Sequence, residues 1–421
     1  MPALRPALFQ PGRYLPTETW RRNQYAVFIA VFVSWLGFSF VQSFLPLYIR
    51  QLGVVDVGQI ALLSGVALGI SPLMSGLLAP IWGILADRYG VKIMVQRSLL
   101  SFVVLNILAS LAVTPWQFLA CRFGIGLLGG FGPMTTSLVT LGAPQKEVGP
   151  AIGRLQAIQI LATAAGPTLG GLVADSFGIR TSFVVTASLC AVAFLLMTSL
   201  YREDREQLAR RNQPGSLPVR GVLALSGFIP IAIMLFITQY VDRGFGPIVP
   251  LFVAEIDPSV PVASTAGLVF SAGLFVSAIA ASQIGGLVNR HEVRTMLPIC
   301  AAVGVLGSLP LIFFGKLWLM VVVQVLMGFS AGTIVTLSYA AIAQVVPDTS
   351  RATSFGFLGS AVSLASALGP VGSGALAGFT LHTVYIVDAI LYTGSLGISL
   401  ALWRQLRKRT GPASLIEGGR A

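Results

Sequence analysis

Charged residues are scarce in this sequence. They make up 10% of the 421 residues, whereas an average soluble domain has about 25%. Hydrophobic residues make up 55% of the chain. A soluble chain of this length would form roughly two or three domains, and the polar residues needed to cover their surfaces are lacking. We therefore expect a protein embedded in a lipid bilayer rather than a soluble enzyme.

Cysteine and histidine are also scarce. The three cysteines lie in apolar stretches, lack the spacing of metal ligands, and are too few for a disulfide framework. The two histidines, His291 and His382, do not lie near a nucleophile and an acid. No Gly-x-x-x-x-Gly-Lys run occurs, so the sequence gives no support for direct use of ATP. We expect no enzymatic activity, no metal site and no cofactor.

Long apolar stretches are what the sequence has in abundance. A membrane-spanning helix needs roughly 20 mostly apolar residues. The first apolar stretch is too long for the core of a signal peptide, so we expect it to remain as a spanning helix. Twelve stretches qualify, at about residues 25–49, 60–82, 93–113, 116–141, 153–174, 181–200, 223–253, 262–285, 295–315, 317–343, 354–378 and 383–403.

Basic residues are distributed unevenly over the connections between these stretches. With both ends of the chain placed in the cytoplasm, the inside segments hold 22 of the 27 Lys and Arg residues, and the outside loops hold three. Short loops rich in Lys and Arg stay on the cytoplasmic side. We therefore predict that both termini are cytoplasmic. The net charge of +12 then reflects loops that face anionic lipid, and no nucleic-acid partner is expected.

The chain divides into two similar halves. Only one connection is long, and six apolar stretches lie on either side of it. We predict an N-terminal tail, a six-helix bundle, a linker, a second six-helix bundle and a C-terminal tail, at residues 1–24, 25–200, 201–221, 222–403 and 404–421. Because each half has an even number of spans, both insert with the same polarity, and a pathway is expected between them.

An internal repeat supports this division. A constant offset of 202 to 204 residues relates positions in several helices, which chance matches of glycine and proline would not produce. The matched positions are Pro46 and Pro250, Trp116 and Trp318, Gly126 and Gly328, Gly130 and Gly332, and Gly166-Pro167 and Gly369-Pro370.

Three motifs carry a family resemblance. Residues 83–92 read Gly-Ile-Leu-Ala-Asp-Arg-Tyr-Gly-Val-Lys, with a weaker copy at 285–294. This patch resembles the signature loop of the major facilitator superfamily, although Val91 stands where the family usually has a basic residue. Arg122, together with Gly126 and Gly130, resembles a second family motif. Gly166-Pro167-Thr-Leu-Gly170-Gly171 resembles a third, which marks proton-driven exporters.

The resemblance covers residues 25–403 and implies an all-α integral membrane protein, with twelve transmembrane helices in two pseudo-symmetric six-helix bundles. The pattern is most similar to the twelve-span drug:proton antiporter branch. It implies that the charged loop forms a latch on the cytoplasmic side, although the same basic residues also act as a topology signal. The residues concerned are Gly83, Asp87, Arg88, Gly90 and Lys92.

The third motif is expected to act through its backbone. Pro167 removes a backbone hydrogen bond, and Gly166, Gly170 and Gly171 allow a neighbouring helix to come close. The resemblance implies a seal against leakage and a flexing point in exporters. Ordinary helix packing is the alternative explanation of these glycines.

Three charged residues within the spans are candidates for proton coupling. Asp242 aligns with Phe38 by the repeat, and a carboxyl group at that depth can bind a proton near neutral pH because burial disfavours its charged form. It can also be half of a structural pair with Arg243 in a kinked, hydrated segment. Asp388 is the second candidate carrier. Arg122 provides a fixed positive charge that favours ionisation of a nearby carboxyl group, or it extends towards the outer interface.

Polar and aromatic side chains within the spans are candidates for the substrate cavity. Each one can equally form interhelical hydrogen bonds or pack against other helices. They are Trp35, Phe38, Gln42, Asn106, Gln156, Gln159, Gln239, Tyr240 and Gln324.

The leading functional hypothesis is secondary active export of small amphipathic, drug-like compounds in exchange for protons. Export of a sugar or another metabolite, or uptake by symport, remains open. The expected partners are a small-molecule substrate, protons and the lipid bilayer. We expect a monomer in the bacterial inner membrane.

Overall fold

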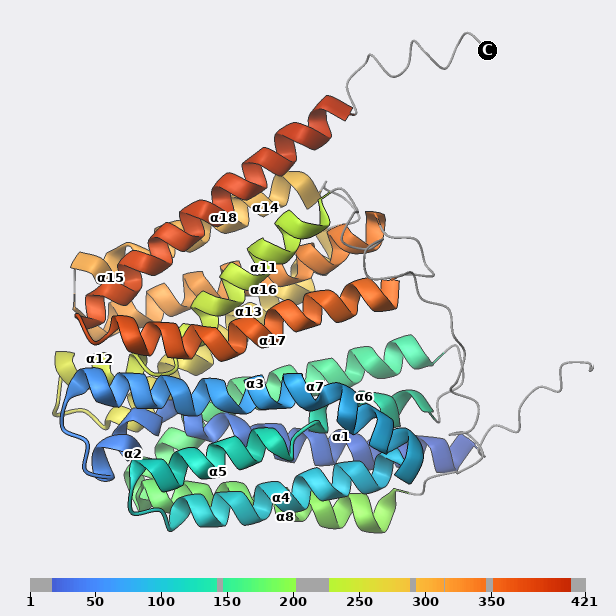
Figure 1. The fold of residues 1–421 in the computed structure, drawn as a ribbon. Coiled ribbons are helices and arrows are strands. Elements are labelled where there is room, and N and C mark those ends of the chain that lie inside the picture. The colour runs from blue at the N-terminus through green and yellow to red at the C-terminus, as the bar shows by residue number, and fades with distance from the viewer. Residues whose placement is uncertain are drawn as a thin grey trace, which may run out of the picture.

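Helices form all the regular secondary structure in the described part of the chain, which in this computed structural model comprises residues 17–141, 147–201, 227–287, 293–313, 315–345 and 351–409 (Figure 1). The first half contains α1 (Thr17–Phe40), the short 3-10 helix η1 (Val41–Ser43), α2 (Leu45–Gln51), α3 (Val57–Tyr89), α4 (Val91–Ser110), α5 (Pro115–Leu127), α6 (Phe131–Leu141), α7 (Val148–Phe177) and α8 (Ile179–Leu200).

The second half repeats this arrangement. It contains α11 (Phe228–Gly244), α12 (Val249–Ile256), α13 (Val262–Leu287), α14 (Val293–Ser308), α15 (Pro310–Phe313), α16 (Leu317–Val345), α17 (Arg351–Leu376) and α18 (Leu381–Arg409). Most of the expected linker lies outside the described residues, which stop at 201 and resume at 227.

The helices account for twelve transmembrane segments. Within the described residues, ten helices are long and apolar enough to cross a membrane, and the pair α11–α12, bent by 44°, makes an eleventh. The remaining segment consists of α5 and α6, which have 13 and 11 residues. The expected all-α fold with twelve spanning segments is therefore confirmed.

Two expected segments differ from the sequence-based boundaries. The fourth was expected to be one helix over 116–141, but it breaks between α5 and α6, where Gly130 has a φ of +94° that other residues rarely adopt. The first helix begins at Thr17 rather than near Tyr25. Trp20 and Gln24 are buried against the rest of the protein, so the helix continues beyond the apolar stretch.

The first span of each half breaks at an equivalent place. In the first half, α1 gives way to η1 and then to α2, which has Pro46 in its first turn. In the second half, α11 gives way to α12, which has Pro250 in its first turn. Proline is well tolerated at the start of a helix because the backbone N–H that it lacks would be unpaired there. The repeat found in the sequence is thus visible as a shared break.

The two bundles meet through two helix pairs, and the first pair is α3 with α17. The backbone at Gly65 lies directly against the carbonyl group of Pro370, and the backbone at Gly374 lies against the carbonyl group of Ala61. Farther along α3, no described atom lies within 4 Å of the position a Cβ would take at Gly83. The tight contact, which extends to Gly69 against the carbonyl group of Ala367, is therefore limited to the half of α3 nearer its start.

The second pair, α7 with α13, repeats this contact. Gly267 lies against the carbonyl group of Pro167, and Gly171 lies against the carbonyl group of Ala263. These residues correspond to those of the first pair at offsets of 202 and 203 residues. Both contacts lie at the end where α3 and α13 begin and α7 and α17 finish, which we call the closed end. Towards the opposite, open end the bundles diverge (Figure 1).

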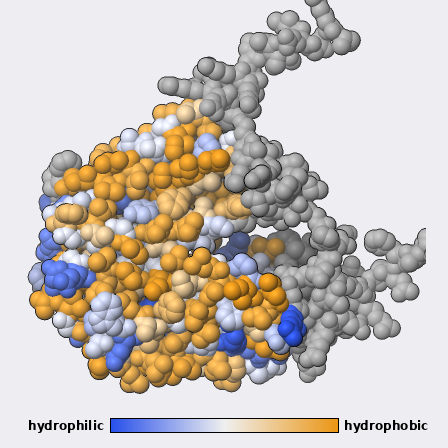
Figure 2. Space-filling model, viewed as in Figure 1, coloured by the Kyte–Doolittle hydropathy of each residue, from blue (hydrophilic) through white to orange (hydrophobic). Residues whose placement is uncertain are grey.

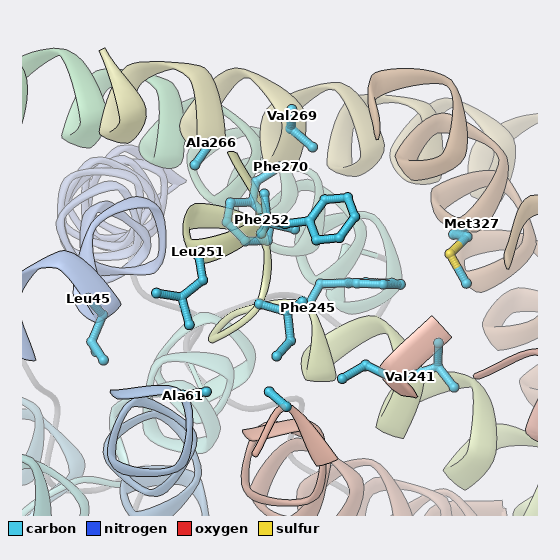
Figure 3. Packing of buried hydrophobic residues seen from close by; sticks show 14 of the residues in the cluster. Leu45, Ala61, Val241, Phe245, Leu251, Phe252, Ala266, Val269, Phe270 and Met327 are labelled. Atoms are coloured by element: carbon cyan, nitrogen blue, oxygen red, sulfur yellow. The ribbon is translucent and has the colours of Figure 1, made fainter. Parts of the chain in front are cut away.

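Apolar side chains of both halves form one core at the closed end (Figure 3). Leu45 and Ala61 of the first half belong to the same buried cluster as Leu251, Phe252 and Phe270 of the second half. Glycine and alanine at the helix crossings bring backbones into contact, and these larger side chains fill the space beside them. The core therefore holds the bundles together at one end only.

The described part of the face seen in Figure 2 is largely apolar. Large hydrophobic side chains are exposed on nearly every spanning helix, as expected for a protein whose surroundings are lipid. Trp116 and Trp318 are both exposed at the start of their helices, 202 residues apart. Tryptophan favours the boundary between lipid and water, so this pair marks equivalent depths in the two bundles.

Candidate functional site

A cavity of about 280 Å³ lies inside the first bundle. Helices α1, α3, α4, α5 and α8 and the segment joining α5 to α6 surround it, so the break at Gly130 helps to form it. Its walls combine aromatic rings with a few polar groups, the composition typical of ligand pockets. The side chains used below are Trp35, Phe38, Phe102, Asn106, Arg122 and Phe131.

Arg122 lines this cavity, as expected for an arginine that faces a cavity rather than the outer interface. Its Nε donates a hydrogen bond to the carbonyl oxygen of Ala67 on α3 at 2.9 Å. The hydroxyl group of Ser71 donates to the carbonyl oxygen of Arg122 at 2.6 Å. These two bonds fix both the backbone and the side chain of Arg122 against α3.

Aromatic rings form the apolar wall. The ring of Phe38 packs edge-on against Phe102 at a centroid distance of 4.7 Å and against Phe131 at 6.0 Å. Trp35 lies 6.3 Å from Phe38 in the same manner. The indole Nε1 of Trp35 is buried and has no hydrogen-bond partner among the described residues.

The charged loop between α3 and α4 turns at Gly90. Its φ of +99° and ψ of +142° form a tight turn that glycine adopts without a steric penalty. Gly83 lies inside α3 and makes no close approach to any described residue in this conformation.

The cations of this loop have different surroundings. Arg88 is exposed and lies over the ring of Tyr89, 5.4 Å from its centroid. The ammonium group of Lys92 donates to the carbonyl oxygens of Tyr201 at 2.6 Å and Thr198 at 3.3 Å. A cation is favourable there because the last carbonyl groups of a helix lack partners. Lys92 thus ties α4 to the end of α8. Asp87 lies in the last turn of α3, and its side chain is outside the described part.

The third motif lies in α7, between α1 and the other bundle. Gly166 packs against Ser39 and Gly170 packs against Phe40, both of α1. Pro167 and Gly171 form the contact with α13 described above. The motif therefore has two faces, one towards its own bundle and one towards the other.

Asp242 lies in the last turn of α11, just before the bend. Its Oδ2 is 3.8 Å from Nε of Arg243, which is an ion pair without a hydrogen bond, and its side chain is 18% exposed. The Gly-Phe-Gly-Pro run at 244–247 that follows breaks the helix but does not open onto a cavity, because residues 244–250 are buried and Phe245 and Ile248 pack into the core.

Asp388 is buried more deeply than Asp242. It is 2% exposed, and its Oδ2 has no hydrogen-bond partner among the described residues. Three tyrosines, Tyr240, Tyr385 and Tyr392, lie within electrostatic range of it. Tyr392 is also within range of Asp242, so one aromatic side chain connects the surroundings of the two acids.

The remaining cavity candidates are dispersed. Asn106 lines the cavity, and its amide group donates to the carbonyl oxygen of Phe102 at 2.8 Å. Tyr240 packs with its hydroxyl group against Gly372 of α17, and Gln324 is buried against Gly273 of α13. Gln156 is exposed, and Gln42, Gln159 and Gln239 are half-buried.

Sequence reasoning missed several residues of the cavity, namely Ser71, Ser75, Phe131 and Thr186. The repeat could have indicated one of them, because Thr186 stands 202 residues before Asp388, which is a candidate for proton coupling. Ser71 and Ser75 are ordinary hydroxyl residues in an apolar stretch, and nothing in their local sequence indicates that they face a cavity.

Comparison with known proteins also divides the chain into two halves. A profile of the Major Facilitator Superfamily matches residues 27–231 and matches again over residues 231–420. The chain belongs to the major facilitator superfamily. The double match reflects the two equivalent bundles. Members of this superfamily are transporters, so the chain is a membrane transporter and not an enzyme.

Curated relatives and solved structures agree with this assignment. The multidrug resistance protein MdtG of Salmonella arizonae is 32% identical over 320 residues, which are 75% of this chain and 78% of that protein. MdtG of Citrobacter koseri is 30% identical over 398 residues, or 93% and 96% of the two chains.

Two solved structures share the fold. A bacterial homologue of the human lysosomal transporter Spinster, in an inward-facing and unoccupied conformation, has a TM-score of 0.76 at 16% identity, covering 94% of this chain and 100% of that one. The nucleoside transporter NupG has a TM-score of 0.67 at 14% identity, covering 89% and 99%. At these identities the likeness concerns the fold alone.

Proposed function

We propose that this protein exports small amphipathic, drug-like compounds across the bacterial inner membrane in exchange for protons, by alternating access. The observation that carries the proposal is the closure of one end of the molecule through two equivalent helix pairs, α3–α17 and α7–α13. Two lobes that touch at one end can rock about their shared midline and open the other end. The printed names of the MdtG relatives support drug-like compounds as the substrates.

The orientation follows from charge. The open end carries Arg88 and Lys92, and α8 finishes and α11 begins at that end. Loops rich in Lys and Arg stay in the cytoplasm, so the open end faces inwards and both termini are cytoplasmic. The structure then corresponds to the state that receives substrate from the cytoplasm or from the inner leaflet of the membrane.

Asp242 is the proposed proton carrier. It lies beside the bend between α11 and α12, and its partial exposure gives water a route to the carboxyl group. Arg243 is close enough to compensate the charge when the proton leaves, and Arg122 supplies a fixed positive charge in the opposite bundle. Asp388 is buried and has no cation within range among the described residues, so an ionised form would be costly there.

The glycine–proline motif of α7 is the proposed seal of the closed end. Pro167 and Gly171 bring α7 into backbone contact with α13, and so narrow a contact excludes water and protons. A symporter would more usually lack this motif, and for that reason we favour export over uptake.

The test is transport by purified protein in liposomes with an imposed pH gradient. We expect lipophilic dyes and antibiotics to move against their gradient, in the direction opposite to proton flow. A protonophore should abolish this movement, and protein-free liposomes provide the control for leakage. Accumulation of a hydrophilic sugar in the direction of proton flow would instead establish the symport alternative and overturn export.

A further inference from the structure

The first bundle contains arginines without compensating acids. Arg97 on α4 and Arg122 on α5 lie inside spanning helices, and no described carboxyl group is within electrostatic range of either. An arginine inside the membrane normally pairs with an acid or faces a watery cavity. The acids in the described first half, which lie at helix ends, are Glu18, Asp56, Asp87, Glu147 and Asp175.

Arg97 is only partly engaged by its neighbours, because its Nε and one terminal nitrogen are buried without a hydrogen-bond partner among the described residues. Its guanidinium group stacks over the ring of Trp82 at 3.4 Å from the centroid, and one terminal nitrogen donates to the carbonyl oxygen of Gly129 at 2.8 Å. Gly129 also lines the cavity. Arg97 therefore adds positive charge beside the cavity while its side chain is held in place.

Arg122 is held in place but not saturated. Its Nε is bound to Ala67, and its two terminal nitrogens have no hydrogen bond to any described residue. A guanidinium group fixed through Nε presents the remaining donors in a geometry that suits a carboxylate. Among the residues that line the cavity, none is an acid.

The aromatic wall of the cavity provides the contact surface for the apolar part of a ligand. Phe38, Phe102 and Phe131 form an apolar surface, and the ring of Trp35 extends it. Ligand pockets span about 300–1,000 Å³, so the 280 Å³ here suits a single ring system rather than a whole drug molecule.

We infer that this cavity binds an aromatic carboxylate, with the carboxylate at Arg122 and the ring against Phe38 and its neighbours. The inference deepens the proposed function by naming the acidic, aromatic part of a substrate as what the first bundle recognises. A lipophilic cation of the same shape would meet Arg122 and Arg97 with no acid to balance them. The cavity therefore selects against cations.

The test is equilibrium binding to the purified full-length protein in detergent, without any pH gradient. The probes are 2-naphthoate, neutral 2-naphthamide and 2-naphthylmethylammonium, which share one ring system and differ in charge. We expect naphthoate to bind at least about tenfold more tightly than the ammonium probe, because a charged hydrogen bond is gained in one case and like charges meet in the other.

Variants separate the charge of Arg122 from its packing. Arg122→Gln introduces the residue found at the equivalent position of the second half, Gln324. It should weaken naphthoate binding by roughly tenfold or more and leave naphthamide binding nearly unchanged. Arg122→Lys should retain part of the preference for the anion. The matched control is Arg180→Gln, because Arg180 also donates to a backbone carbonyl group, that of Ala112 at 3.2 Å, but lies outside the cavity.

A second variant keeps the inference testable if Arg122→Gln fails to fold. Phe38→Leu keeps an apolar side chain and removes the central ring of the aromatic wall, and it should weaken binding of both naphthoate and naphthamide a few-fold. Equal affinity for the anionic and cationic probes, or no binding of any probe, would overturn the inference. Naphthoate binding without proton-driven transport would leave the inference standing and refute the proposed function. Proton-driven export of dyes without naphthoate binding would do the reverse.

Discussion

The carboxylate of Asp175 accepts a hydrogen bond from the backbone N–H of Ser264 at 2.6 Å and another from the Ser264 hydroxyl group. Asp175 lies in the last turn of α7, and Ser264 lies in the first turn of α13, so one bundle caps a helix of the other. An acid is favourable at the start of a helix, where backbone N–H groups lack partners. At the equivalent crossing, Gly378 and Leu62 stand in place of Asp175 and Ser264, so these positions supply no side chain for such a cap.

This relationship predicts that Asp175→Asn weakens the closed end. The amide accepts hydrogen bonds less strongly and carries no charge, so we expect a few-fold shift towards separation of the bundles at that end. Spin labels at Val55 and Pro258, which are exposed at the closed end of the two bundles, would report the distance distribution. The three native cysteines are buried and should not compete for label.

The matched control for that prediction is Asp56→Asn. Asp56 accepts a hydrogen bond from the backbone N–H of Gln59 at 2.7 Å and caps α3 within its own bundle, also at the closed end. The substitution Asp56→Asn should therefore leave the distance distribution between the two labels unchanged. If Asp175→Asn gives the same distance distribution as the unmodified protein, the cap does not stabilise the closed end.

A second prediction concerns the backbone contacts between bundles. Alanine at Gly65 or Gly267 would place a methyl group against the carbonyl group of Pro370 or Pro167. Overpacking costs about 1–3 kcal/mol, which should move the population away from the closed arrangement by about fivefold or more. Spin labels at Val55 and Pro258 measure this change in population. Gly397→Ala on α18, with no described atom near its Cβ position, should change nothing.

The two buried acids should respond differently to neutralisation. Asp242→Asn removes the proposed proton carrier, so pH-driven transport should be lost while substrate binding persists. Asp388→Asn replaces a group whose charged form has no described partner, and it should be tolerated. Transport in liposomes with and without the gradient distinguishes these outcomes. If Asp388→Asn uncouples transport and Asp242→Asn does not, the two assignments must be exchanged.

The two glycines of the charged loop give opposite expectations for stability. Gly90→Ala would force a side chain into a φ of +99°, and strain of this kind costs about 1–3 kcal/mol. Gly83→Ala lies in a helix interior with open space around it, so it should be neutral or stabilising by up to about 1 kcal/mol. Thermal unfolding of the detergent-solubilised variants compares them. Equal melting temperatures would mean that the turn at Gly90 relaxes without strain.

The spanning helices and the internal repeat could be predicted from the sequence. A spanning helix depends mainly on a run of about 20 apolar residues, so most spans could be located from composition alone. The repeat was readable because Gly126, Gly166, Gly328 and Gly369 occupy helix crossings, where a side chain would collide with a backbone carbonyl group. A position that tolerates only one residue type holds that residue in both halves, so the repeat can be recognised there.

The helix breaks were only partly predictable. Gly244 through Pro247 indicated a bend in the seventh span, and the bend is present. The break at Gly130 was not anticipated, since Gly129-Gly130 resembles the small-residue pairs that also occur inside packed helices. Whether such a pair breaks a helix depends on what packs beside it.

The sequence by itself determined that the chain lies in a membrane, that it crosses twelve times, and that its halves are equivalent, because apolar length and repeat spacing are properties of the chain alone. Only the tertiary structure decided which end is closed and which polar residues share a cavity. Arg122 and Trp35 line the same cavity because α1 and α5 pack around one space, and Asp175 contacts Ser264 because two bundles touch. Such pairs depend on how each helix is rotated about its axis, and an almost uniformly apolar stretch does not specify that rotation.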